Sequence, residues 1–230
     1  MLLEMLYPNR CPACDELVEE AGFCPKCRKT IRIASEPVCR CCGKKLKDDR
    51  FEFCYDCRIG KHDFDEARSV YIYEGGMKKS MYRFKYSNRR AYAKVYAAHA
   101  LKAQELWLER IRPEGIVPVP MYKPKERARG YNQAESFARA LGERLGVEVR
   151  TDLLVRRKET RAMKTMSREE RRNNLLLAFQ GRECGVNLKR VLIVDDIYTT
   201  GATADACSFA LKAVGAKSVY VMCVCVGRGD

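Results

Sequence analysis

Four cysteine pairs with the spacing C-x-x-C fall within the first 57 residues of this 230-residue chain. The pairs are Cys11/Cys14, Cys24/Cys27, Cys39/Cys42 and Cys54/Cys57. A two-residue gap in a tight turn lets both thiolates face one ion at Zn–S distances near ~2.3 Å, and two such turns complete a tetrahedron. A segment this short, with few large apolar side chains, cannot support a core alone, so bound metal would supply folding energy. The spacing therefore predicts a metal-binding module.

Disulfides and a C-x-x-C redox centre are the alternatives to metal. Four pairs in register are more than redox chemistry requires, and the N-terminus lacks the basic and apolar regions of a secretory signal. We therefore expect a reducing cytoplasmic location with thiols as ligands. Four thiolates close the coordination shell, so the zinc would be structural, with one or two ions bound. Sequential and interleaved pairing fit the spacing equally. Cys41 is left as a spare thiol, and Gly43 suits a turn that needs positive φ.

The change in cysteine content predicts a domain boundary near residue 60, with a module at 1–60 and a larger domain at 61–230. The formal net charge of +14 is concentrated in the second part. Three segments contain this charge: residues 77–90, 123–129 and 155–172. Such an excess favours an anionic partner, although charge runs often face water. No apolar run approaches the length of a membrane span, so we expect none.

From residue 61 onward, strand-like and helix-like segments alternate. This pattern predicts a mainly parallel sheet covered by helices on both faces, with ligands bound at the carboxyl ends of the strands. The expected strands are Ala67–Tyr73, Gly115–Val117 (ended by Pro118), Val191–Val194 and Ser218–Val226, and the expected helices are 91–110, 132–145 and 202–214.

One stretch combines a buried strand, two carboxylates and a Thr/Gly turn that opens a helix. It runs from Val191 through Asp195 and Asp196 to Thr203. The turn, with Gly201 at its centre, points backbone N–H groups at one spot beside the positive end of a helix dipole, which suits a phosphate. Ionised carboxylates accept hydrogen bonds, and sugar hydroxyls donate them. The stretch therefore indicates a ribose 5-phosphate site; a metal-binding aspartate pair beside an incidental turn is the alternative.

The same stretch resembles the sequence motif of type I phosphoribosyltransferases. The whole chain resembles the competence protein F (ComF) family, which joins a cysteine zinc module to such a domain. The resemblance rests on the paired cysteines and the motif, together with Arg83–Tyr86, Val117–Pro120, Lys125–Gln133 and the Glu170–Phe179 run. It implies a type I phosphoribosyltransferase-like fold, with a small N-terminal zinc ribbon or knuckle of four-cysteine sites.

The resemblance also implies a role for each part of the site. Asp195 and Asp196 would hold the ribose hydroxyls of phosphoribosyl pyrophosphate (PRPP). The 5-phosphate would contact Thr199, Thr200, Gly201, Ala202 and Thr203. Arg127, Arg129 and Gly130, in the loop after Val119, would face the pyrophosphate, and residues 155–172 would form a mobile lid. Mg²⁺ would be shared with oxygens of the substrate.

Two functions stay open. One is a PRPP-binding enzyme that displaces pyrophosphate; the other is a non-catalytic single-stranded-DNA-binding protein that reuses the fold. The resemblance implies a role in natural competence and DNA uptake, with a DNA-translocating helicase and a recombination mediator as partners. Tyr82, Phe84 and Tyr86 among basic residues suit a single-strand groove. The spacing of Met77, Met81 and Phe84 instead favours the buried side of a helix.

Three other side chains have less specific interpretations. His99 lies on an apolar helix face and is interpreted as a packing residue. His62, just after the last cysteine pair, is a reserve ligand, and Tyr198 could touch a sugar or simply pack. No segment of the sequence identifies the acceptor.

Overall fold

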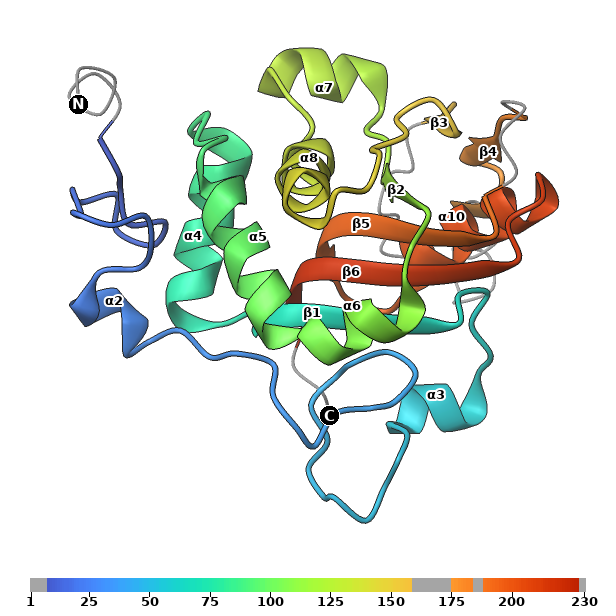
Figure 1. Cartoon of the computed structure of the whole chain (residues 1–230), viewed down its shortest axis with the longest axis horizontal. Coiled ribbons are helices and arrows are strands. Elements are labelled where there is room, and N and C mark those ends of the chain that lie inside the picture. The colour runs from blue at the N-terminus through green and yellow to red at the C-terminus, as the bar shows by residue number, and fades with distance from the viewer. Residues whose placement is uncertain (1–7, 159–174, 184–187, 228–230) are drawn as a thin grey trace, which may run out of the picture.

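A parallel sheet lies at the centre of the molecule. The computed structural model describes residues 8–158, 175–183 and 188–227. Within these residues the main sheet has four strands in the order β1-β6-β5-β2, all parallel (Figure 1). The strands are β1 (Glu66–Ile72), β2 (Gly115–Pro118), β5 (Arg190–Tyr198) and β6 (Ser218–Val226). The predicted parallel α/β sheet is confirmed.

Helices pack on both faces of this sheet, as predicted. Side chains of β5 alternate between two separate apolar clusters: Leu192 and Val194 enter one, and Val191 and Ile193 enter the other. The first cluster contains residues of α4 (Gly75–Tyr86), α5 (Tyr92–Ala103) and α8 (Gln133–Leu145). The second contains residues of α10 (Ala202–Ala213). Burial on both faces explains why β5 and β6 are rich in Val, Ile and Cys rather than alternating with polar residues.

The single helix expected over residues 91–110 is wrong. The segment forms α5 and a second helix, α6 (Glu105–Ile111), separated at Gln104. Gln104 leaves helical geometry, and its side-chain amide donates a hydrogen bond to the Ser69 carbonyl of β1. The change of direction lets Trp107 bury its ring against Tyr220.

Strand β5 is longer than the sequence indicated. We expected it to end at Val194, before the acidic residues, but the parallel ladder with β6 continues through Asp195 to Tyr198. Strand β2 ends at Pro118 as expected, and β6 has the predicted bounds.

A two-stranded sheet and a short helix lie beside the main sheet. Strands β3 (Leu154–Arg156) and β4 (Phe179–Gly181) form a separate antiparallel pair, and β4 packs against α10. Helix α7 (Lys123–Arg129) occupies the region predicted as a loop after Val119. The start of the predicted lid, at 155–156, thus belongs to β3, whereas its residues 159–172 lie outside the described part of the chain.

The N-terminal region consists of cysteine-bearing turns and two short helices, α2 (Pro25–Arg28) and α3 (Tyr55–Ile59). It packs directly on the larger domain. Phe23 contacts the rings of Tyr71 and His99, and the His99 Nδ1 atom lies 2.6 Å from the Tyr71 hydroxyl. His99 is therefore engaged in packing. The boundary at residue 60 stays a prediction.

The same N-terminal region covers the outer edge of β1. The Ala34 N–H donates to the Val70 carbonyl, and the Ile72 N–H donates to the Arg32 carbonyl. Further along the strand, the Ala67 N–H donates to the Cys41 carbonyl. Gly43, with φ of +69°, fits closely above this contact, because a Cβ there would lie 2.8 Å from the Ala67 carbonyl oxygen.

Among the described residues, no helix is long and apolar enough to cross a membrane.

Candidate functional site

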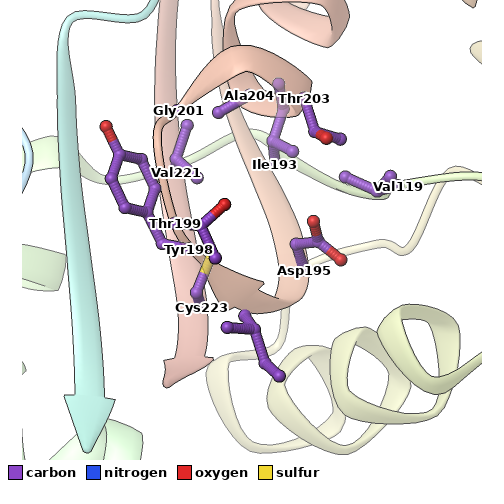
Figure 2. A pocket seen from close by; sticks show the side chains of 11 residues that line it. Val119, Ile193, Asp195, Tyr198, Thr199, Gly201, Thr203, Ala204, Val221 and Cys223 are labelled. Atoms are coloured by element: carbon purple, nitrogen blue, oxygen red, sulfur yellow. The ribbon is translucent and has the colours of Figure 1, made fainter. Parts of the chain in front are cut away.

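A pocket lies where β5 leads into α10. Its wall is formed by Asp195, Tyr198 and Thr199 from the end of β5, by Gly201, Thr203 and Ala204 from the turn and first residues of α10, and by Val119 after β2. Figure 2 shows Asp195 beside Val119, with Thr203 and Ala204 grouped at the start of the helix. The position agrees with the rule that ligands of open parallel sheets bind at the carboxyl ends of strands.

The turn from β5 into α10 has the geometry of an anion site. Gly201 has a φ of +85° and is the N-cap of α10, so the turn uses a conformation that other residues rarely adopt. Thr199 and Thr200 are exposed, and the first turn of the helix follows at Ala202. Unpaired N–H groups and the helix dipole favour an anion at such an N-terminus. The predicted phosphate residues are thus brought together.

The two aspartates have different surroundings. Asp195 lines the pocket, and its Oδ1 accepts a hydrogen bond of 2.8 Å from the Asp196 N–H. Burial and the adjacent Asp196 charge raise the pKa of Asp195 to about 7. The carboxyl is therefore poised to bind a proton or a hydroxyl group near neutral pH.

Asp196 forms an ion pair with Lys85 of α4, at 3.0 Å between Oδ2 and Nζ. Sequence reasoning missed this contact. Lys85 lies in the Arg83–Tyr86 segment, but nothing in the pattern indicated that its side chain reaches β5. Lys85 also lowers the pKa of Asp195, against the larger effect of burial.

The three residues predicted to face pyrophosphate lie at the end of α7. Arg129 donates a hydrogen bond of 2.6 Å to the Gln133 side chain, and its guanidinium lies 4.9 Å from the centre of the Tyr86 ring. Tyr86 directly follows Lys85, the partner of Asp196, in α4. Arg127 is exposed. Gly130 ends the helix with φ of +85°, and its carbonyl accepts a hydrogen bond from Arg90.

The eight paired cysteines form two quartets, and both are sequential. Cys11, Cys14, Cys24 and Cys27 are one group, and Cys39, Cys42, Cys54 and Cys57 are the other. Sulfur atoms of Cys14 and Cys24 lie 3.8 Å apart, and those of Cys42 and Cys54 lie 3.6 Å apart. A tetrahedron with Zn–S bonds of ~2.3 Å has S···S edges of about 3.8 Å, so both quartets fit structural zinc.

Cys41 and His62 lie beside the second quartet rather than apart from it. Together with Cys57 they form a third group close enough to share an ion. The His62 Nε2 atom is 3.5 Å from the Cys57 sulfur, while Nδ1 is hydrogen-bonded to the Asp205 carboxylate at 3.0 Å. His62 thus lies in contact with a ligand of the second quartet, and its role as a reserve ligand stays a prediction.

Two family models match separate parts of the chain. A model described as a double zinc ribbon domain matches residues 2–58, and one described as a phosphoribosyl transferase domain matches residues 131–230. Fold and site therefore define a phosphoribosyltransferase-like domain joined to a double zinc ribbon.

Individual relatives extend the match over most of the chain. It is 30% identical to "Competence protein F" of Haemophilus influenzae, covering 89% of this chain and 90% of the relative. The chain belongs to the competence protein F family. "Competence protein ComFC" of Streptococcus pneumoniae is 29% identical, over 87% of this chain and 86% of that protein. "DNA utilization protein YhgH" of Escherichia coli K12 is 25% identical, over 89% and 96%.

Proposed function

We propose that the pocket between β5 and α10 binds PRPP with Mg²⁺, and that the protein acts in the uptake or use of DNA. The observation that supports it best is the placement of Asp195 next to the Gly201 turn, at the carboxyl edge of a parallel sheet. A sugar hydroxyl and a phosphate of one ligand can occupy these two positions together. The names of the relatives, competence proteins and DNA utilization proteins, support the biological context.

In this proposal the 5-phosphate accepts hydrogen bonds from the N–H groups of the Gly201 turn and from the hydroxyls of Thr199 and Thr203. Asp195 accepts a hydrogen bond from a ribose hydroxyl. Asp196, whose charge is neutralised by Lys85, stabilises the ribose end of the site. Arg127, Arg129 and Gly130 face the pyrophosphate. Mg²⁺ would supply charge neutralisation for the diphosphate oxygens.

A transfer reaction at this site would break the bond between C1 of ribose and the pyrophosphate oxygen. The acceptor would donate the electron pair and lose its proton. Pyrophosphate would leave through an oxocarbenium-like state, as in glycoside chemistry. The basic side chains at the end of α7 would stabilise charge developing on the leaving group.

The test is calorimetric titration of PRPP and Mg²⁺ into the zinc-loaded protein. We expect micromolar binding by wild type, lost in an Asp195→Asn/Asp196→Asn variant. Glu143→Gln, which changes an exposed carboxylate of α8, is the matched control and should bind like wild type. Absence of binding by a folded, zinc-replete wild type would refute the sugar-phosphate site.

A second candidate function, binding of single-stranded DNA, is favoured by an exposed aromatic surface on α4. Tyr82 and Tyr86 are 64% and 61% exposed, and their ring centres lie 5.0 Å apart. The Arg129 guanidinium packs on Tyr86, and the exposed Lys78 and Lys79 lie on the same helix. Exposed aromatic rings beside cations suit single-stranded DNA, because bases can stack on the rings while the cations contact the backbone. Phe84, in contrast, is fully buried, as the helical spacing indicated.

This candidate is tested by the affinity for a fluorescent oligothymidylate at several salt concentrations. Tyr82→Ala/Tyr86→Ala should weaken binding at least 10-fold, whereas Tyr55→Ala should not. Tyr55 is 61% exposed on the zinc ribbon and is therefore a matched control. Equal affinities in the two variants would place DNA binding elsewhere or exclude it. A cytoplasmic location, a helicase and a recombination mediator belong to the same proposal.

A further inference from the structure

His62 stands at the junction between the second zinc ribbon and the proposed phosphate-binding turn. One ring nitrogen, Nε2, lies 3.5 Å from the sulfur of Cys57. The other, Nδ1, lies 3.0 Å and 3.1 Å from the two carboxylate oxygens of Asp205. The side chains of His62 and Asp205 are only 10% and 11% exposed. The imidazole thus connects a cysteine of the second quartet to the first turn of α10.

The ring is held in place by further contacts. Phe64 stacks on it with ring centres 4.5 Å apart and planes 20° from parallel. The backbone N–H of Asp63 donates a hydrogen bond of 2.9 Å to the same Asp205 carboxylate. Both oxygens of Asp205 are therefore occupied by donors from the segment that follows the zinc ribbon.

The imidazole ring also packs directly against the proposed phosphate-binding turn at Gly201. A Cβ atom on Gly201 would lie 3.0 Å from the Cε1 atom of His62 and 2.5 Å from the Tyr198 hydroxyl oxygen. The N–H of Asp205 in turn donates to the Gly201 carbonyl, at 2.8 Å. His62 and Tyr198 therefore support one side of Gly201, and Asp205 holds the other end of the turn.

Asp205 makes this support necessary. A carboxylate in the first turn is favourable for the helix dipole but repels an anion at the same N-terminus. The donors of His62 and Asp63 offset that charge. The arrangement resembles the outer-shell hydrogen bonds that orient metal ligands, where substitution commonly costs 10–100-fold in affinity or activity.

We propose that His62 is a positioning residue that couples the second zinc ribbon to the phosphate-binding turn. Zinc fixes Cys57, Cys57 and Asp205 fix the imidazole, and the imidazole holds Gly201 in the geometry that receives the 5-phosphate. This inference rests on the proposed PRPP site. Because coupling between two binding events is reciprocal, ligand at the turn should also retain zinc in the second quartet.

The experiment uses two ligands and one matched control. Ribose 5-phosphate probes the turn, whereas pyrophosphate with Mg²⁺ probes the opposite end of the proposed site. His62→Ala should weaken the binding of ribose 5-phosphate at least 10-fold and that of pyrophosphate less than 2-fold. The variant should keep its full zinc content. His99→Gln, which changes the other histidine and lies against the first ribbon, should leave both affinities unchanged.

A second readout does not depend on affinity alone. Ribose 5-phosphate should slow chelator removal of one of the two zinc ions from wild type. In His62→Asn, whose amide retains a donor for Asp205 but no longer reaches Cys57, this protection should disappear.

Three outcomes would overturn the inference. The first is that His62→Ala binds ribose 5-phosphate with the affinity of wild type. The second is that this variant loses affinity for both ligands equally. The third is that ribose 5-phosphate still protects zinc from the chelator in His62→Asn. If wild type itself binds neither ligand, the proposed PRPP site fails instead, and the coupling fails with it.

Discussion

The raised pKa of Asp195 makes the stability of the protein depend on pH, and Asp195→Asn should remove that dependence. The folded protein keeps a proton on Asp195 up to a pKa of about 7, whereas the unfolded chain releases it near ~3.9. Between these values the unfolded state binds fewer protons, so the free energy of unfolding falls by about 1.4 kcal/mol per pH unit as pH rises. From pH 5.5 to 8 the loss is about 2 kcal/mol.

The assay is urea denaturation of zinc-loaded wild type and Asp195→Asn at several pH values in this range. The difference between the two free energies is the measured quantity, because zinc release and other titrations are common to both proteins. As pH rises from 5.5 to 8, the free energy of unfolding of the variant should increase by about 2 kcal/mol relative to that of wild type. A difference that stays constant within about 0.5 kcal/mol would refute the assignment of a raised pKa to Asp195.

Three other outcomes can be checked independently. Chelation of zinc should lower the Tm by about 10 °C or more, measured by circular dichroism, because the cysteine turns belong to the same apolar clusters as the sheet. Phe84→Ala should cost about 3–5 kcal/mol in urea denaturation, whereas Tyr82→Ala should cost less than about 1, since the first side chain is fully buried and the second is 64% exposed. Lys85→Met should move the pH dependence described for Asp195 to higher pH, because it removes a positive charge that lowers that pKa; an unchanged midpoint would contradict the contact.

Much of the fold could be predicted from local pattern. The bounds of β6 follow from one continuous apolar run, and the helix at 202–214 follows from its turn and terminal glycine. The break at Gln104 could not be predicted, because the apolar spacing continues across it and the cause is a hydrogen bond to a distant strand. For the same reason Asp195 looked like the residue after a strand, although β6 supplies partners that extend the ladder.

The candidate site likewise contains some features that local sequence predicts and others that depend on tertiary packing. Contiguous residues of the Gly201 turn were predicted together because one local geometry requires them. Lys85 was missed, since its contact with Asp196 depends on how α4 packs over the sheet. Cysteine spacing predicted the quartets but not their pairing, which the path of the chain decides. The contact of His62 with both Cys57 and Asp205 likewise needed three-dimensional information.

The backbone contacts along β1 have a consequence for how the protein behaves without metal. Residues 32–34 and Cys41 pair with the outer edge of β1, and these residues lie between and within the cysteine turns. If the turns lost their metal, that edge would present unpaired N–H and C=O groups to other chains. Exposed strand edges of this kind recruit neighbouring molecules into intermolecular sheets. We therefore expect bound zinc to limit aggregation as well as to hold the ribbons together.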